Sequence, residues 1–464
     1  MKYVVFVLAL LGMIPAAIMS AVNRRLFMLL PICFMLPVVV YQKTSINPIS
    51  FEDYRGTVRG YEVNSVYLAG ILILAAILLR GRKISLAPDW GARLYLLYFA
   101  WSCLSLMNVE SMLVAGAEVW KMVMMYVVFL AVYNWLKIEK DPRPFLVGFA
   151  LVFLGQFEIV VREHLVGIYQ VRGSFMHQNS FALYMLMGLP LFFSYYLNSG
   201  RRERGKWLFA LAFFLGSGCL VRTYSRGSIA CYPIALAVVL FLSLRRNFNF
   251  RQIRRLVPLC ALGLVGFLLI LPRVIDRFVY APESSGNTRV NFARCALNMI
   301  RAEPLFGVGL NNWGIKVNPP YPYWKGTGLR AGIGDDPTFK DGIVETVYLL
   351  VCAECGIPAL LVMLAWYAYY VISCRRLVRR LAGTSWFFLP VGLLGGLTGA
   401  FLQSTLEWVL KQSVNFSEMM IFFAMISFLN GNWKELRERE AEAKKQRLLK
   451  IQEKKKAKEI EHAQ

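Results

Sequence analysis

The sequence predicts an all-α, polytopic helical membrane protein. Of its 464 residues, 57% are apolar and only 17% are charged, whereas a soluble globular protein is typically about 45–50% apolar and about 25% charged. Apolar runs of roughly 20 residues recur along most of the chain, and each is about long enough to cross a ~30 Å hydrocarbon core as a helix. This pattern excludes a soluble enzyme, a secreted disulfide scaffold and a disordered chain.

The apolar runs predict about 12–13 transmembrane helices, and the first two runs are so close together that the side of the N-terminus stays open. The runs cover residues 2–21, 26–41, 64–79, 92–107, 117–135, 145–161, 180–197, 207–221, 227–244, 256–271, 343–371, 387–405 and 414–431. We divide the chain into an N-terminal transmembrane bundle (1–271), a long loop with short helices (272–342), C-terminal transmembrane helices (343–431) and a charged tail (432–464).

Basic residues set the predicted orientation. The formal net charge of +24 gathers largely in short clusters between the apolar runs, and Lys and Arg in short loops mark the cytoplasmic side of a membrane protein. This distribution accounts for the charge without a nucleic-acid partner. The clusters near residues 80–83, 201–204, 245–255 and 375–380 fall on one side, together with the tail, which we expect in water or against membrane lipid headgroups. The other side receives the loops 42–63, 108–116, 162–179, 222–226, 272–342 and 406–413.

Three arginines on this outer side are candidate anion ligands. Arg222 and Arg226 lie four residues apart between two apolar runs, so they can share a helix face. They are either interfacial arginines that reach the water or a site for phosphate oxygens, which a guanidinium matches with a planar fork of donors. Arg289 begins a predicted helix over 287–301, where Asn287 or Thr288 would cap the first turn and the free amides add positive potential.

Glu345 is the most informative acid, because it opens the apolar run 343–371 on the outer side. It is either a general base or a structural partner for an arginine. Glu354, deeper in the same run, is expected to be paired structurally. His177 precedes another run on the outer side and is a candidate hydrogen-bond partner for a sugar or a backbone group. Neither the histidines nor the nine cysteines have metal-ligand spacing, so we predict no metal and no cofactor.

Several motifs, taken in order, resemble the bacterial O-antigen ligase family, which includes O-antigen and exopolysaccharide polymerases. The likeness covers residues 170–360 well and the remainder mainly by hydropathy. The matching pieces are Arg172-Gly-Ser-Phe175 with His177-Gln-Asn179, Thr223-Tyr-Ser-Arg-Gly227, Asn287-Thr-Arg289 with Pro304-Leu-Phe-Gly-Val-Gly309, and Val344 to Pro358 with its Tyr348-Leu pair. Where the ligases usually show His-Asn before the Tyr-Leu pair, this chain has Glu345-Thr346.

The resemblance implies a multi-pass glycosyltransferase of the bacterial inner membrane, with an active site that faces the periplasm. Such proteins transfer a glycan from an undecaprenyl-pyrophosphate carrier to a hydroxyl of a lipid or glycan acceptor, without a metal. It places Arg226 and Arg289 on the pyrophosphate, and Glu345 can serve as the base in place of the family histidine. Further candidate substrate ligands are Arg222, His177, Asn179 and Tyr348. Whether the chain is a ligase or a polymerase stays open.

A small-solute transporter is the alternative that the number of apolar runs also allows. A transporter is expected to carry charges at mid-membrane and helices that are broken there. The charges that stand out in this sequence gather at the outer ends of the runs and in the long loop, which favours chemistry at the outer surface.

The first testable prediction concerns topology. A reporter that is active only in the cytoplasm should give a signal when fused to the tail after Trp433 and none when fused within the loop 272–342, because the basic clusters lie on the side of the tail. A matched periplasmic reporter at both positions serves as the control. The reverse pattern would contradict the orientation and place every candidate site residue in the wrong compartment.

Overall fold

The secondary structure of the described residues is almost entirely helical. This computed structural model describes residues 2–51, 54–200, 205–246, 248–279, 283–329 and 342–463. Over these residues β pairing is confined to two isolated bridges, Ile46 with Val63 and Ser50 with Gly60. The helices are α1 (Lys2–Val22), α2 (Arg24–Met35), η1 (Leu36–Val40), α3 (Tyr41–Thr44), α4 (Ser65–Leu79), α5 (Trp90–Leu104), η2 (Ser105–Asn108), α6 (Met112–Glu139), α7 (Arg143–Leu165), α8 (Gln178–Asn198), α9 (Lys206–Arg222), α10 (Arg226–Arg246), α11 (Phe250–Val279), α12 (Glu283–Ala302), α13 (Trp313–Lys316), α14 (Val347–Arg380), α15 (Phe388–Gln403), η4 (Val409–Lys411) and α16 (Ser413–Ala463).

Seven helical segments within the described ranges are long and apolar enough to cross a membrane. They are Arg24–Thr44, Met112–Glu139, Arg143–Leu165, Gln178–Asn198, Arg226–Arg246, Val347–Arg380 and Ser413–Gln446. Shorter apolar helices cover Phe6–Val22, Ser65–Leu79 and Phe388–Gln403. The predicted all-α, polytopic membrane fold is therefore confirmed, whereas the total of about 12–13 spans stays a prediction.

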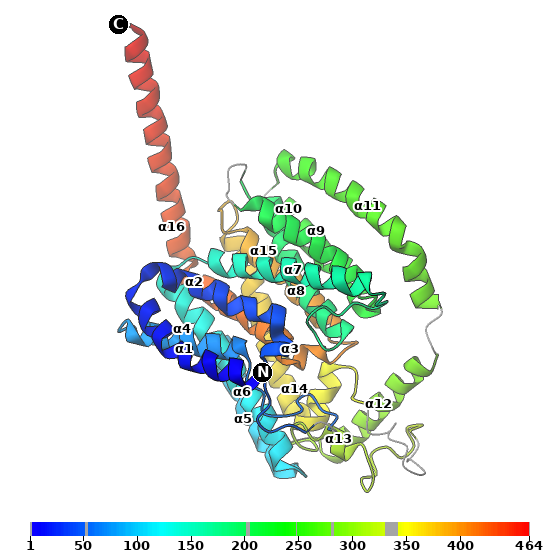
Figure 1. Ribbon diagram of the computed structural model, residues 1–464. Coiled ribbons are helices and arrows are strands. Elements are labelled where there is room, and N and C mark those ends of the chain that lie inside the picture. The colour runs from blue at the N-terminus through cyan, green and yellow to red at the C-terminus, as the bar shows by residue number, and fades with distance from the viewer. Residues whose placement is uncertain are drawn as a thin grey trace.

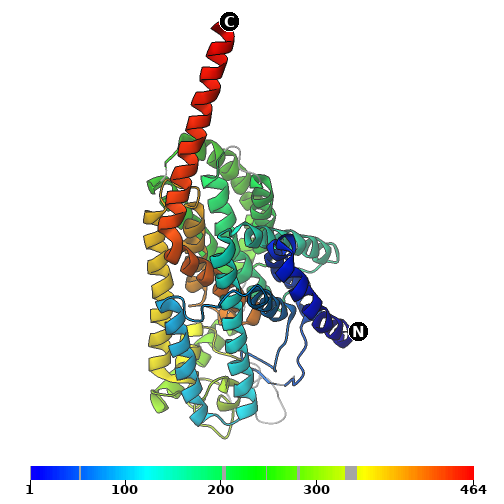
Figure 2. The same ribbon diagram turned by 90° about the vertical axis from the view of Figure 1, so that its left-hand side faces the viewer.

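Helix α8 lies at the centre of the bundle. It packs against α9, α10, α15 and α16, and nearly all residues of its span are buried. Its sequence is apolar on every side, which in a membrane suits contact with lipid as well as with other helices, so the packing and not the apolar pattern places it at the centre. Helix α16 packs along α6 and α8 and then continues out of the bundle as a long charged helix (Figures 1 and 2).

The segments predicted to face the cytoplasm gather at the end of the bundle from which α16 emerges. There Arg24 pairs with Glu139 (3.3 Å) and Lys140 with Glu435 (2.5 Å). Helices α12 and α13, which belong to the long loop, lie at the opposite end (Figure 1). The basic cluster at 201–204 lies outside the described residues. This two-ended arrangement is what the predicted orientation requires, and the compartment that each end faces stays a prediction.

The long loop packs into a break in α14. Gly356, inside this helix, has φ 83° and ψ 172°, a backbone conformation that favours glycine. A Cβ on Gly356 would lie 2.1 Å from the carbonyl oxygen of Leu305. The break frees two carbonyl oxygens at positions 353 and 354, which accept hydrogen bonds from the amides of Val308 (2.9 Å) and Gly309 (3.0 Å). The two motifs 304–309 and 353–358 therefore form one structural unit.

Two acids and two lysines form a buried charge network beside this unit. The Nζ atom of Lys411 lies 3.4 Å from a carboxylate oxygen of Glu118 and 3.4 Å from one of Glu354, and Lys121 Nζ lies 2.7 Å from Glu118. None of the four side chains is more than 7% exposed. Lys121 also donates to the carbonyl oxygen of Lys411 (2.8 Å). These contacts confirm the expected structural pairing of Glu354 and fix η4 between α6 and α14.

The charge network gives the second prediction. Lys411→Met should lower stability by about 3–5 kcal/mol, because it leaves two buried carboxylates without their shared cation. Thermal unfolding of the purified protein in detergent, together with its abundance in the membrane, measures the effect. Lys325→Met is the matched control, since Lys325 is an exposed lysine in the long loop. Equal stability of the two variants would show that Lys411 does not hold η4.

Candidate functional site

Three helix N-termini meet around one short segment, residues 403–407, which leads from α15 toward η4. Ser228, in the first turn of α10, donates a hydrogen bond to Gln403 Oε1 (2.8 Å). Thr346, just before α14, donates from Oγ1 to the carbonyl oxygen of Ser404 (3.2 Å). The third N-terminus is that of α8, which reaches the far end of the same segment. Free amides at helix N-termini favour anions, so this convergence creates a region of positive potential.

Glu407, at the far end of this segment, brings three of the predicted site residues together. Its Oε1 atom accepts from Asn179 Nδ2 (2.8 Å) and lies 3.0 Å from Arg289 Nη2. The same Nη2 atom lies 3.7 Å from Glu345 Oε2. The Glu407 side chain is only 6% exposed, whereas Arg289 and Glu345 are 35% and 34% exposed. Arg289 is thus held between one buried and one accessible carboxylate.

The environment of Glu407 favours its protonated form. Burial and the neighbouring carboxylate of Glu345 raise the pKa of Glu407 to about 8, and a hydrogen bond shared with Glu345 acts in the same direction. Arg289 and Asn179 oppose this shift. Because two carboxylates this close resist ionising together, Glu407 retains its proton near neutral pH.

Arg226 is the first residue of α10, directly after a tight turn from α9. Tyr224 forms this turn with φ 50°, and its buried ring stacks on Tyr169 with 5.0 Å between the ring centroids. A Cβ on Gly227 would lie 3.6 Å from Leu406, so the start of α10 packs on the 403–407 segment. Arg226 is half-buried and makes no hydrogen bond or ion pair with any other residue that the structure describes.

Two other predicted substrate ligands already have partners within the protein. Arg222 hydrogen-bonds the ring of His164, and the Tyr348 hydroxyl donates to the carbonyl oxygen of Phe401 (3.0 Å). These contacts hold the end of α9 and the first turn of α14 in place. Direct contacts of Arg222 and Tyr348 with a substrate stay predictions.

His177 caps α8. Its Nδ1 atom accepts a hydrogen bond from the backbone amide of Asn179 (3.2 Å). Burial lowers the pKa of His177, and the nearby carboxylate of Glu345 raises it. The cap uses the neutral ring as an acceptor and aligns the helix start that presents Asn179 to Glu407.

The predicted helix of the long loop is present, but it begins earlier than expected. It starts at Glu283, so Arg289 lies in the second turn and neither Asn287 nor Thr288 caps the first. The capping interpretation was wrong because the preceding polar residues continue the helix.

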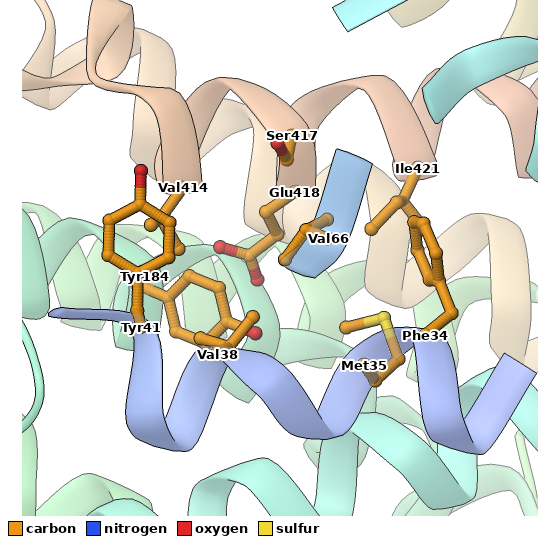
Figure 3. A pocket seen from close by; sticks show the side chains of 10 residues that line it. All are labelled: Phe34, Met35, Val38, Tyr41, Val66, Tyr184, Val414, Ser417, Glu418 and Ile421. Atoms are coloured by element: carbon orange, nitrogen blue, oxygen red, sulfur yellow. The ribbon is translucent and has the colours of Figure 1, made fainter. Parts of the chain in front are cut away.

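Another buried acid, Glu418 of α16, lies apart from this cluster. Its carboxyl group projects into a small cavity between α16, α8, α4 and the α2–η1 segment (Figure 3). The cavity volume is about 10 Å³, which is room for about one water molecule. Both carboxyl oxygens and the hydroxyl of the facing Tyr184 lack hydrogen-bond partners among the described residues. With no cationic side chain among its ten lining residues, the cavity does not suit a phosphate.

Glu407 is the site residue that the sequence analysis missed. It is separated by 118 residues from Arg289 and by 228 from Asn179. No periodic pattern in the sequence links residues that are so far apart. A usable signal did exist, because Glu407 lies beside an apolar run on the outer side, as Glu345 does. The buried pair Glu118 and Lys121 was also not singled out. Over the residues that the structure describes, no group of three His, Cys, Asp or Glu side chains could hold a metal ion.

The fold and the cluster define a multi-helix membrane protein with a charged site at the end opposite the tail. Residues 211–364 match the family model described as O-Antigen ligase, which confirms the resemblance found in the motifs. This range includes Arg226, Arg289 and Glu345 but neither Asn179 nor Glu407. The family match indicates glycan transfer of the O-antigen ligase or polymerase type. A comparison with curated proteins gives no match.

Proposed function

We propose that this protein transfers a glycan from an undecaprenyl-pyrophosphate carrier to a hydroxyl of a lipid or glycan acceptor, at the periplasmic face of the inner membrane. The observation that carries this proposal is the meeting of Asn179, Arg289 and Glu345 beside the start of α10 at one end of the bundle. Cationic and carboxylate side chains placed side by side are what the leaving group and the acceptor of such a reaction need.

Arg289 and Arg226 supply donors for the diphosphate. Both carboxylates engage Arg289 through Nη2, and its Nε atom is buried without a hydrogen-bond partner among the described residues. Arg226 stands at the N-terminus of a long helix, where the free amides add to its charge. Guanidinium N–H groups without a partner among the described residues fit the oxygens of a phosphate group.

The two kinds of group then divide the reaction between them. The acceptor oxygen bonds to the anomeric carbon while the bond from that carbon to the carrier phosphate oxygen breaks. The electron pair of the broken bond stays on the diphosphate, whose charge the two arginines stabilise. The acceptor proton passes to Glu345, which is exposed enough to meet an acceptor. Attack opposite the leaving group inverts the anomeric configuration.

The transporter alternative has some support from the break in α14 and from the buried charges around Lys411. Discontinuous helices and buried charges form the solute sites of many transporters. In this protein, however, the carbonyls freed at Gly356 are occupied by the long loop, and the buried charges of Lys411, Glu118 and Glu354 pair with one another. Neither feature leaves groups for a solute, so we favour the transferase.

The third prediction tests the arginines. Arg226→Lys and Arg289→Lys should each lower glycan transfer by about 10²-fold, because lysine keeps the charge but loses the planar fork of donors. The double variant should lose much less than the product of the two single effects if both arginines contact one diphosphate. Glycan display in cells that lack the native copy gives the readout, at matched membrane abundance.

Arg294→Lys provides the control for this experiment. Arg294 lies on the same helix as Arg289 but is exposed, so its replacement should leave transfer unchanged. Normal transfer in both Arg226→Ala and Arg289→Ala would reject the proposed role of the arginines.

The fourth prediction tests Glu345 as the base. Glu345→Gln keeps the size of the side chain but removes its basicity, so turnover should fall by about 10²–10⁴-fold. Because Glu345 also contacts Arg289, affinity for undecaprenyl pyrophosphate separates a base from a structural partner. A base role does not weaken that affinity, since Glu407 still holds the arginine, whereas a structural role weakens it. Glu345→His restores the residue of the similar ligases and should recover part of the activity, whereas normal turnover in Glu345→Gln would move the base elsewhere.

A further inference from the structure

We propose that Glu407 is a positioning residue that, as a protonated carboxylic acid, orients Arg289 toward the donor diphosphate without cancelling its charge. The inference rests on the glycan transfer proposed above. It implies that donor binding weakens at high pH, where Glu407 loses its proton. Glu407 lies beyond the range that matches the family model, so the residue is assigned here from its contacts alone.

The geometry gives the two oxygens of Glu407 different tasks. Oε1 receives both donated contacts, one from Asn179 (2.8 Å) and one from Arg289 (3.0 Å). Oε2 is therefore left to carry the proton and share it with Glu345, the hydrogen-bonded neighbour on the other side. A neutral carboxylic acid has one donor and one free acceptor oxygen, which satisfies all three neighbours of Glu407 at once.

Charge balance explains why the proton matters. With Glu407 neutral, the single charges of Arg289 and Glu345 cancel, and an arriving diphosphate meets a cluster without net charge. With Glu407 ionised, two carboxylates surround one guanidinium, and the cluster repels an anion. Because Glu407 is almost fully buried, water screens this additional charge poorly.

The groups that face Glu407 determine where this change falls on the pH scale. They are Arg289 from α12, Glu345 ahead of α14, and Asn179 at the start of α8, with His177 beside Glu345. Burial and Glu345 raise the pKa of Glu407 to about 8. Donor affinity should therefore weaken as the pH rises from 7 to 9, which is the interval in which Glu407 loses its proton.

The fifth prediction measures this weakening in the full-length protein in lipid nanodiscs, with undecaprenyl pyrophosphate as the probe. Wild-type affinity should fall by about tenfold between pH 7 and pH 9, because the protonated fraction of a group with a pKa near 8 falls by about that factor over this interval. Glu407→Gln keeps a neutral donor and acceptor at this position and should show no such fall. Titration of the probe itself is common to both proteins and cancels in the comparison.

Two further variants define the expected pattern. Glu407→Leu should lower affinity at both pH values, because it removes the contacts to Arg289 and Asn179, and Glu407→Gln should restore most of the loss at pH 7. Glu158→Gln is the matched control and should follow the wild type, since Glu158 is an exposed acid near the C-terminal end of α7 that pairs with Arg162. Equal pH dependence in wild type and Glu407→Gln would overturn the proposal.

A readout without any ligand separates this inference from the proposed function. A carboxyl group whose pKa is raised by folding is stabilising below its unfolded pKa, near 4.3, and that stabilisation is lost as the pH rises to about 8. The melting temperature of the wild type should therefore fall relative to that of Glu407→Gln between pH 5 and pH 8 and run parallel above it. If this difference appears while undecaprenyl pyrophosphate does not bind, the transferase proposal fails and the protonation of Glu407 stands. If the melting temperatures of the two proteins change in parallel with pH over the whole interval, protonation of Glu407 is contradicted.

If Glu407→Gln does not fold, Glu345→Gln gives an independent test. It removes the like-charged neighbour, so the pKa of Glu407 should fall and the pH-dependent loss of affinity should move to lower pH. An unchanged position of that loss would show that the Glu345–Glu407 pair does not set it.

Discussion

The position of the candidate site depends on the ion pairs of Lys411. This lysine is buried between Glu118 of α6 and Glu354 of α14, and desolvated charges tolerate few arrangements other than the one that pairs them. Glu407 lies four residues earlier on the same connection between α15 and α16. A structural charge network and the functional carboxylate therefore share one short segment, so whatever fixes Lys411 also limits where Glu407 can be.

A second constraint fixes the other partner. Arg289 is on α12, in the long loop, and a loop of this length would by itself allow many positions. The loop is anchored because 304–309 fills the break in α14, where Gly356 permits an approach that a side chain would block. The same helix α14 begins beside Glu345. Thus the break in α14 anchors the long loop, and Glu345, just before the start of α14, contacts Arg289 directly. Together these two contacts limit the position of Arg289.

The sequence was sufficient for the fold class because long apolar runs and basic clusters report on the membrane directly. It also led to Arg289 and Glu345, since both stand beside motifs at the outer ends of apolar runs. It could not give their contact with Glu407, because that depends on how α8, α12 and α15 pack, which no local pattern encodes. The predicted start of α12 was wrong for a different reason. Asn287 and Thr288 are typical capping residues, but in this protein they lie inside a helix that begins at Glu283.

The two carboxylates around Arg289 differ in a way that suits the proposed chemistry. A guanidinium in a partly dry site needs a counter-charge while the site is empty, yet a counter-charge that cannot leave would compete with the diphosphate. Glu345 is accessible and its contact is long at 3.7 Å, so it can yield to a phosphate and then face the acceptor. Glu407 is buried and close at 3.0 Å, so it stays. An acid that stays beside a cation in the bound state interferes least when it is neutral, and burial next to a second carboxylate is the physical means of keeping it so.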